Sequence, residues 1–262
     1  MTDRLVNYTA EGGLAILELN APPANTYSYE MNRQLDEAIL SARFDDSVHV
    51  IVLRGAGEKF FCAGADINKL SRMSPTFKYN FCLHANETLC RLEQTPKLVI
   101  AALNGHTVGG GLEVALAADI RVAKKDGGKI GLPEVNLGVL PGTGGTQRLA
   151  RAVGRSRAIE LMASGRTFGF EEAQRLGIVN EILDAEGFMQ RALDYSRQYL
   201  PPGKASRAVG LIKRSVQTGL ELPLSEALAL ERELQQQLFG SQDAGEGLSA
   251  YLDKRPPRFT GS

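Results

Sequence analysis

The sequence predicts an α/β protein with a helical C-terminal region. Short apolar runs alternate with segments of helical periodicity as far as Asp184, and beyond that residue only helical patterns remain. One run, Val48 to Leu53, is apolar and β-branched at nearly every position, which is typical of a strand covered on both faces and therefore parallel to its neighbours. The length of 262 residues fits one large domain, or one domain with an appendage.

Proline, serine and glycine separate the first expected elements. The run Leu14 to Leu19 predicts a strand that stops at Ala21-Pro22-Pro23. Ser28 can cap a helix from Tyr29 to Arg43, in which apolar residues recur at helical spacing. Glycines then end the strand Val48 to Leu53.

In the middle of the chain, a short apolar run is followed directly by small residues. Phe60 to Ile67 predicts a strand that feeds a loop with backbone bare enough for ligand contact. A helix is expected from Thr76 to Gln94, followed by Pro96 and a buried strand from Leu98 to Leu103. The strand Ile120 to Ala123 continues the alternation and ends in a turn at 124–129.

The remaining elements become helical. A glycine-rich loop, Gly138 to Leu149, leads into a helix. A short helix from Ser156 to Gly165 and another from Phe170 to Leu176 precede the strand Ile178 to Leu183. Four helices are expected after it, at 187–200, 204–218, 224–239 and 243–253. The third carries a leucine stripe, which either packs on the same chain or forms a subunit interface: Leu224, Leu228, Leu234 and Leu238.

Composition excludes several classes of function. Lys+Arg and Asp+Glu both number 30, so no general affinity for nucleic acid or an anionic membrane is expected. Neither the three cysteines nor the three histidines have metal-ligand spacing, so we expect no metal site and no disulfide framework. Met1 to Ala10 contains no apolar signal core, and no apolar run is long enough to span a bilayer. We expect a cytoplasmic protein.

The stretch Leu98 to Glu113 (LVIAALNGHTVGGGLE) predicts a site for a negatively charged oxygen. It contains a buried strand, a polar turn, a cluster of three glycines and the first turn of an apolar helix. Glycines leave backbone N–H groups accessible, and the positive end of the helix points to the same place. Glu113 follows Gly110 by about one helical turn, so its carboxylate can lie beside that oxygen.

A second acid, Glu134, completes a pair that could act as general acid and general base. A lone glutamate on a helix is usually exposed or paired with a cation. The residues after Glu113 are apolar on nearly all sides of the helix, however, so its carboxylate is expected to be buried. Burial raises the pKa of a carboxyl toward neutrality, and two adjacent acids titrate as a coupled pair.

Four ordered segments resemble the enoyl-CoA hydratase/isomerase (crotonase) family, and the resemblance runs nearly end to end. They are Phe61 to Ile67 (FCAGADI), Asn104 to Glu113 (NGHTVGGGLE), Leu132-Pro133-Glu134 and Leu137 to Leu149 (LGVLPGTGGTQRL). The resemblance implies a crotonase-like spiral of ββα units at 1–195, containing the coenzyme A thioester site. It also implies a helical region at 196–262 that assembles a homotrimer or a dimer of trimers.

The resemblance also implies roles for particular residues. The thioester oxygen would lie between the backbone N–H groups of Ala65 and Gly110, with Glu113 and Glu134 at the two catalytic positions. We favour Glu134 as the group that protonates the α-carbon and Glu113 as the base, although the sequence leaves this assignment open. Coenzyme A enters as part of the acyl-CoA substrate, and no other cofactor is implied. Further thioester contacts are expected at Ala63, Gly64, Asp66, Ile67, Asn68, Gly109, Pro133, Leu137 and Gly142.

The favoured function is therefore hydration of a 2-enoyl-CoA, because both acids are present. Isomerisation, decarboxylation or thioester hydrolysis on the same scaffold is the alternative, and a non-catalytic CoA-binding or RNA-binding protein is a third. Tyr27-Ser28-Tyr29 replaces an asparagine-leucine-asparagine type of segment common in the family. If that region lines the acyl pocket, the two tyrosines indicate an unusual or polar acyl group. Asn68 stands where many members have lysine, which puts the contact with the CoA phosphates in doubt.

Overall fold

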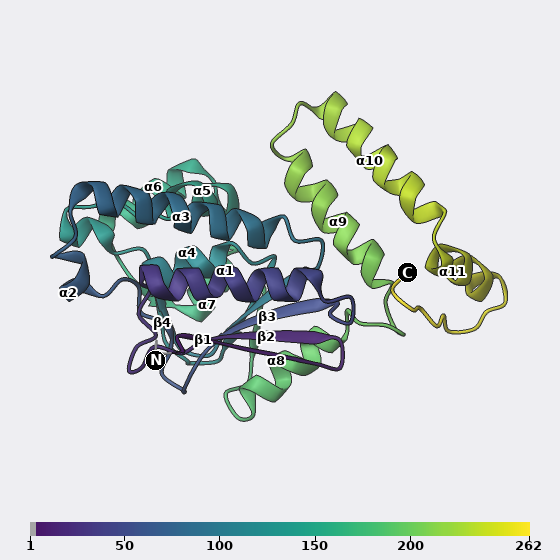
Figure 1. Cartoon of the computed structure of the whole chain (residues 1–262), viewed down its shortest axis with the longest axis horizontal. Coiled ribbons are helices and arrows are strands. Elements are labelled where there is room, and N and C mark those ends of the chain that lie inside the picture. The colour runs from purple at the N-terminus through teal and green to yellow at the C-terminus, as the bar shows by residue number, and fades with distance from the viewer. Residues whose placement is uncertain (1–3) are drawn as a thin grey trace.

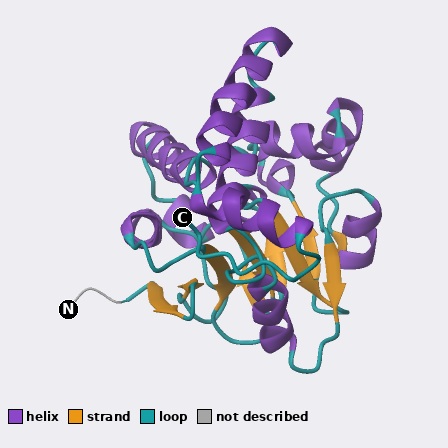
Figure 2. Cartoon of the chain, turned by 90° about the vertical axis from the view of Figure 1, so that its right-hand side faces the viewer, coloured by secondary structure: helices purple, strands orange, loops and turns teal. Residues whose placement is uncertain are grey.

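The computed structural model describes residues 4–262, so the first three residues of the segment Met1 to Ala10 lie outside the described residues. Two sheets with helices packed around them form the body of the molecule (Figures 1 and 2). The larger sheet has the order β1-β2-β3-β5-β7-β10, and it consists of β1 (Val6–Glu11), β2 (Leu14–Leu19), β3 (Val50–Gly55), β5 (Leu98–Leu103), β7 (Ile120–Lys124) and β10 (Glu181–Leu183). The smaller sheet consists of β4 (Phe60–Cys62), β6 (His106–Val108), β8 (Lys129–Gly131) and β9 (Phe168–Gly169).

Most strand pairs are parallel, as the apolar run at β3 predicts. β3 lies between β2 and β5 and is parallel to both. The antiparallel pairs within the described chain are β1 with β2 and β8 with β9, at the ends of the two sheets. Among the strands, β1, β6, β8 and β9 were not expected, because β1 is a polar edge strand and the others have only two or three residues.

The helices follow the predicted order, with ends that differ by a few residues. Ser28 caps α1 as expected, since its hydroxyl accepts from the Met31 N–H. The helices of the body are α1 (Tyr29–Phe44), α2 (Ile67–Leu70), α3 (Pro75–Glu93), α4 (Gly110–Leu116), the 3₁₀ turn η1 (Glu134–Leu137), α5 (Gly145–Val153), α6 (Arg155–Ser164), α7 (Phe170–Arg175) and α8 (Phe188–Arg197). Three more follow: α9 (Ser206–Gly219), α10 (Leu224–Phe239) and α11 (Gln242–Leu252).

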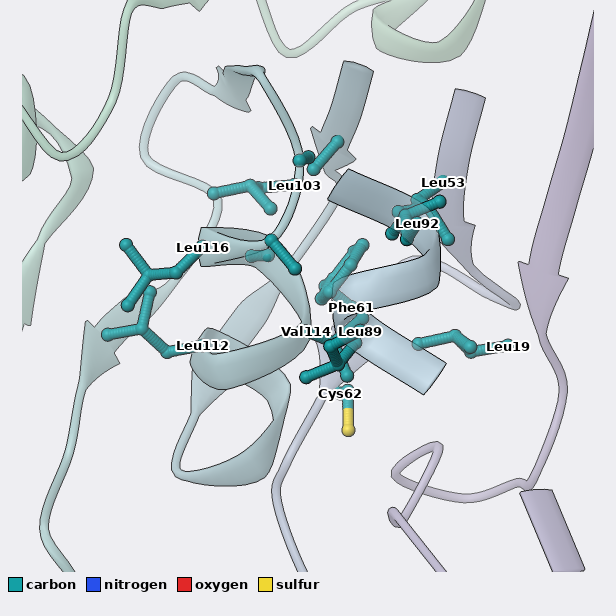
Figure 3. Packing of buried hydrophobic residues seen from close by; sticks show 14 of the residues in the cluster. Leu19, Leu53, Phe61, Cys62, Leu89, Leu92, Leu103, Leu112, Val114 and Leu116 are labelled. Atoms are coloured by element: carbon teal, nitrogen blue, oxygen red, sulfur yellow. The ribbon is translucent and has the colours of Figure 1, made fainter. Parts of the chain in front are cut away.

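The main hydrophobic core fixes the position of α4. All seven residues of α4 are buried, and its leucines and valine belong to the same hydrophobic core as Phe61 of β4 and Leu89 of α3 (Figure 3). Gly111 allows this packing, because a Cβ there would lie 2.2 Å from the Cys62 carbonyl oxygen. The first turn of α4 is therefore held against β4, which ends immediately before the loop containing Ala65.

The three last helices lie to one side of the body, to which α9 is joined by the ion pair of Lys213 with Asp119 at 2.9 Å, and α10 and α11 lie farther out (Figure 1). α10 packs along α9, and Leu234 is buried there, but Leu224 is 74% exposed and Leu228 is 43% exposed. Packing within one chain therefore accounts for only part of the leucine stripe. Among residues 4–262, no helix combines the length and the hydropathy that crossing a bilayer requires.

Candidate active site

The oxyanion corner is built from β6, Gly109 and the start of α4. Gly109 has a φ of 57°, a conformation that glycine adopts without strain, and it reverses the chain so that Gly110 begins the helix. Two of the three glycines are thus the first residues of α4 rather than residues before it, which corrects the expected arrangement. The Gly110 N–H is one of the helical N-terminal donors that has no partner within the helix.

The second donor comes from the loop after β4. Gly64, with a φ of 85°, packs so closely against the corner that a Cβ on it would lie 3.4 Å from the Gly110 nitrogen. Its carbonyl oxygen accepts from the Tyr27 N–H at 2.8 Å, which ties this loop to the segment before α1. Among residues 4–262, neither the Ala65 N–H nor the Gly110 N–H donates a hydrogen bond. Both amides are therefore available to a ligand oxygen.

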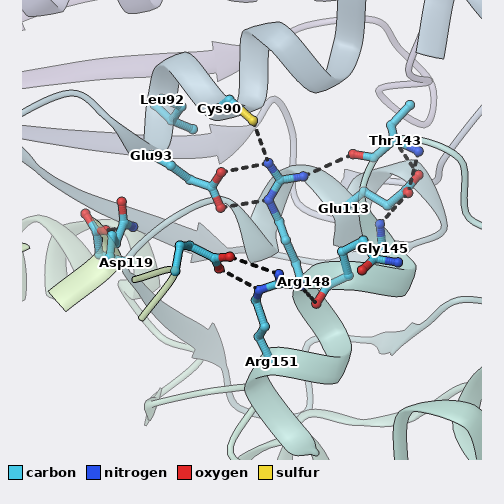
Figure 4. A network of polar contacts seen from close by, with 12 residues as sticks. Cys90, Leu92, Glu93, Glu113, Asp119, Thr143, Gly145, Arg148 and Arg151 are labelled. Atoms are coloured by element: carbon cyan, nitrogen blue, oxygen red, sulfur yellow. Dashed lines mark hydrogen bonds and ion pairs between the residues drawn. The ribbon is translucent and has the colours of Figure 1, made fainter. Parts of the chain in front are cut away.

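Glu113 is buried, and its carboxylate is held by three donors, two from Thr143 in the loop before α5 and one from Gly145, the first residue of α5 (Figure 4). The N–H groups of Thr143 and Gly145 donate to Oε1 at 2.7 and 2.8 Å. The Thr143 hydroxyl donates to Oε2 at 2.5 Å. Three donors facing one carboxyl stabilise negative charge on it and fix its orientation.

Arg148 holds this loop in place from α5. Its guanidinium donates to both carboxylate oxygens of Glu93 at 2.7 Å and to the Thr143 carbonyl oxygen at 3.2 Å (Figure 4). The bidentate pair is mostly buried and joins α5 to the end of α3. Because the same Thr143 donates to Glu113, Arg148 orients the carboxylate indirectly.

Glu134 has a different environment. It begins η1, and its carboxylate lies against Gly109, where a Cβ would come within 2.9 Å of Oε1. Its Oε2 is buried and has no hydrogen-bond partner among the described residues. The pKa of Glu134 is raised to about 7, mainly by burial and to a smaller extent by the charge of Glu113. The two acids therefore have different environments. Glu113 is held by hydrogen-bond donors, whereas Glu134 favours its protonated form up to about neutral pH.

Both glutamates line one cavity of about 510 Å³. The predicted site residues that share this cavity with them are Ala65, Ile67, Gly109, Gly110, Pro133, Leu137 and Gly142. Ala63, Gly64, Asp66 and Asn68 do not line it. Asp66 instead caps α2 by accepting from the Asn68 and Lys69 N–H groups, and Lys69 forms an exposed ion pair with Glu30 at 3.8 Å.

The cavity also contains residues to which sequence reasoning assigned no role. Thr143 and Lys78 line it, and nothing in their local pattern distinguishes them from loop and helix-surface residues. Tyr27 lines it too, which meets the condition set for the tyrosine pair at one of its two positions. Tyr29 does not; its ring packs instead against Phe77 and His84, so only one of the two tyrosines reaches the cavity.

The chain is similar to known proteins over nearly its whole length. The family model for enoyl-CoA hydratase/isomerase matches residues 9–262. A short-chain-enoyl-CoA hydratase of Clostridium acetobutylicum is 36% identical over 94% of this chain and 93% of its own length. The human mitochondrial methylglutaconyl-CoA hydratase is 36% identical over 95% of this chain and 74% of its own.

Solved structures show the same architecture. A Geobacillus kaustophilus protein described as an enoyl-CoA hydratase superposes with a TM-score of 0.96 at 44% identity, covering 100% of this chain and 98% of that one. An enoyl-CoA hydratase from Bacillus anthracis superposes with a TM-score of 0.92 at 31% identity, covering 99% of this chain and 100% of that one.

Proposed function

Because the chain belongs to the enoyl-CoA hydratase/isomerase family, we propose that it adds water reversibly across the 2,3 double bond of a 2-enoyl-CoA. The observation that carries this proposal is the pair of glutamates. Glu113 and Glu134 line one cavity beside two free backbone amides, and their carboxyl groups differ in environment. Addition of water requires one group that accepts a proton and one that donates a proton.

The mechanism follows from where charge develops. Attack of water at the β-carbon moves negative charge onto the thioester oxygen. The N–H groups of Ala65 and Gly110, with the N-terminal end of α4, stabilise this enolate-like oxygen more strongly than the neutral carbonyl. Glu113, held as an acceptor by its three donors, takes the proton from water, and Glu134 delivers a proton to the α-carbon. Coenzyme A is part of the substrate, and the proposed steps use only these groups.

Product identification tests the reaction. We expect crotonyl-CoA to be converted into a thioester heavier by one water, as measured by mass spectrometry. Isomerisation would leave the mass unchanged, decarboxylation would release carbon dioxide, and hydrolysis would release free coenzyme A. The same measurement is made with a panel of linear, branched and dicarboxylic enoyl-CoAs. If the panel gives one of these other products and no hydrated thioester, the proposal is contradicted.

The pH profile tests the assignment of the acid. Since Glu134 acts in its protonated form and burial raises its pKa to about 7, kcat/KM for hydration is expected to fall about tenfold per pH unit above that value. Hydration has no net uptake or release of protons, so kcat/KM for dehydration should fall over the same range. Initial rates in both directions measure this, and a rate that rises through neutral pH would contradict the assignment.

We also propose that further copies of this chain cover the exposed apolar residues of the last helices, as a trimer or a dimer of trimers. Leu220, Leu224 and Leu252 are each more than 70% exposed in the single chain. Leaving such side chains in water is unfavourable, and burying them between subunits removes that cost. Sedimentation equilibrium measures the assembly, and a monomer at micromolar concentration would contradict this part of the proposal.

A further inference from the structure

The cavity that contains the two glutamates also contains one lysine. Lys78 lies in the first part of α3 and is the single cationic side chain among the residues that line the cavity. No hydrogen bond or ion pair of its ammonium group occurs among residues 4–262, whereas Lys69, Lys124 and Lys213 are each paired with a carboxylate. Lys78 is half-buried, and its ammonium group, which has no hydrogen-bonded or ion-paired partner among the described residues, is available to a ligand.

Aromatic rings connect the oxyanion corner to this ammonium group. A Cβ on Gly110 would lie 2.9 Å from the Tyr27 ring, so that ring covers the start of α4. The Tyr27 and Phe81 rings are 5.7 Å apart between centroids, and the Lys78 Nζ lies 5.1 Å from the Phe81 centroid. The wall therefore runs from the amides along two buried rings to the cation.

Apart from Asn136, Thr143 and the two glutamates, the remaining lining of the cavity is apolar. Leu70, Met73 and Pro75 come from the stretch between the end of α2 and the start of α3, and Val139 and Leu140 come from the segment after η1. An anionic group in such surroundings is costly unless a cation accompanies it. Both titratable acids of the lining are glutamates and no other cation lines the cavity, so Lys78 is the one lining side chain whose charge attracts an anion.

We propose that Lys78 binds a carboxylate at the far end of the acyl group, so that the preferred substrates are thioesters of dicarboxylic acids. The proposal rests on the proposed function, because it takes the amides of Ala65 and Gly110 to hold the thioester oxygen. The acyl chain then extends along the Tyr27 and Phe81 rings. Its carboxylate receives a charge-assisted hydrogen bond from the ammonium group.

Binding of unreactive thioesters tests this inference apart from catalysis. Glutaryl-CoA and butyryl-CoA share the coenzyme A moiety and differ in the terminal carboxylate. Wild-type protein is expected to bind glutaryl-CoA more tightly in calorimetric titration. In Lys78→Met, the ratio of the two dissociation constants should shift toward butyryl-CoA by about ten- to a hundredfold, as loss of a hydrogen bond to a charged group implies. Lys78→Arg should retain most of the preference.

Two controls make the result specific. The matched variant Lys125→Met changes an exposed lysine outside the cavity, and the ratio should be that of wild type. The monomethyl ester of glutaryl-CoA, tested on wild-type protein, should lose the preference without any mutation. If Lys78 instead held a phosphate of coenzyme A, Lys78→Met would weaken both thioesters equally and leave the ratio unchanged, which would overturn the inference.

Failure of the proposed reaction and failure of the inference on Lys78 would give different results. If no enoyl-CoA is hydrated but the Lys78-dependent preference for glutaryl-CoA remains, the proposed reaction is wrong and the inference on Lys78 holds. If crotonyl-CoA is hydrated and wild-type protein shows no preference for the dicarboxylic thioester, the reaction holds and the inference on Lys78 is wrong. Because Lys78 also lowers the pKa of Glu134, rates with the variants are compared as ratios between thioesters at one pH.

Discussion

Replacing Glu134 with glutamine is expected to lower kcat for hydration by about a thousandfold, within the range for loss of a general acid. The amide of glutamine has nearly the shape of the carboxyl but cannot deliver a proton to the α-carbon. Since the thioester oxygen is still held by the amides of Ala65 and Gly110, KM should change much less than kcat. Steady-state rates with crotonyl-CoA measure both quantities.

The same substitution should not weaken the fold, which separates loss of chemistry from loss of structure. Burial raises the pKa of Glu134 from 4.5 to about 7, so the folded state holds the proton more tightly than the unfolded chain does. The resulting stabilisation is complete below about pH 4.5 and is lost as the pH rises through about 7. Above that pH the ionised carboxyl destabilises the fold. Glutamine removes this cost, and Glu134→Gln should be about 1 kcal/mol more stable than wild type at pH 8, after allowance for solvent screening of a half-buried group.

Glu160→Gln provides the matched control, because Glu160 is exposed on α6 and lies outside the cavity. Its kcat and its unfolding free energy at pH 8 should equal those of wild type. Two results would contradict the role given to Glu134. One is retention of activity within about tenfold in Glu134→Gln, and the other is a fall in activity that follows a fall in stability.

The outline of the site could be predicted from the sequence because glycines mark the positions where its backbone is unusual. Glycines at 64 and 109 have positive φ values, and Gly111 lies too close to the Cys62 carbonyl oxygen for any side chain. Such positions are readable from sequence, since only glycine satisfies them without strain. The apolar run of β5 was equally clear, and all six of its residues are buried. The crotonase-like fold that the resemblance implies is confirmed by the solved structures of the family.

What the sequence did not reveal depends on contacts between distant segments. The Thr143 hydroxyl meets Glu113 only because the loop before α5 folds back over α4, and Arg148 reaches that loop while pairing with Glu93. Lys78 is one charged residue among many on helix surfaces until α3 is placed beside the cavity. The short strands β6, β8 and β9 are formed by neighbours far along the chain, and two or three residues carry no periodicity to detect.

Removing the Gly110 N–H is expected to lower kcat/KM about a hundredfold beyond any steric effect, which corresponds to about 3 kcal/mol for one oxyanion donor. Gly110→Pro removes that hydrogen, and proline is tolerated at the first position of a helix because its φ suits the helix and no helical bond is lost. The substitution also adds a Cβ, which would lie 2.9 Å from the Tyr27 ring. The variant alone therefore cannot separate the donor from the contact.

Gly110→Ala separates them, because it adds the same Cβ and keeps the N–H. Tyr27 is buried, and its hydroxyl bonds to Asn32 at 3.0 Å, so both variants should displace the ring and raise KM to a similar extent. The further loss in proline over alanine then reports replacement of the N–H by the ring Cδ, and the part due to the lost donor should appear mainly in kcat, since the donor stabilises the enolate-like oxygen more than the carbonyl. Equal rates for the two variants would mean that this amide does not stabilise the developing charge. The oxyanion site would then have to be sought elsewhere in the cavity.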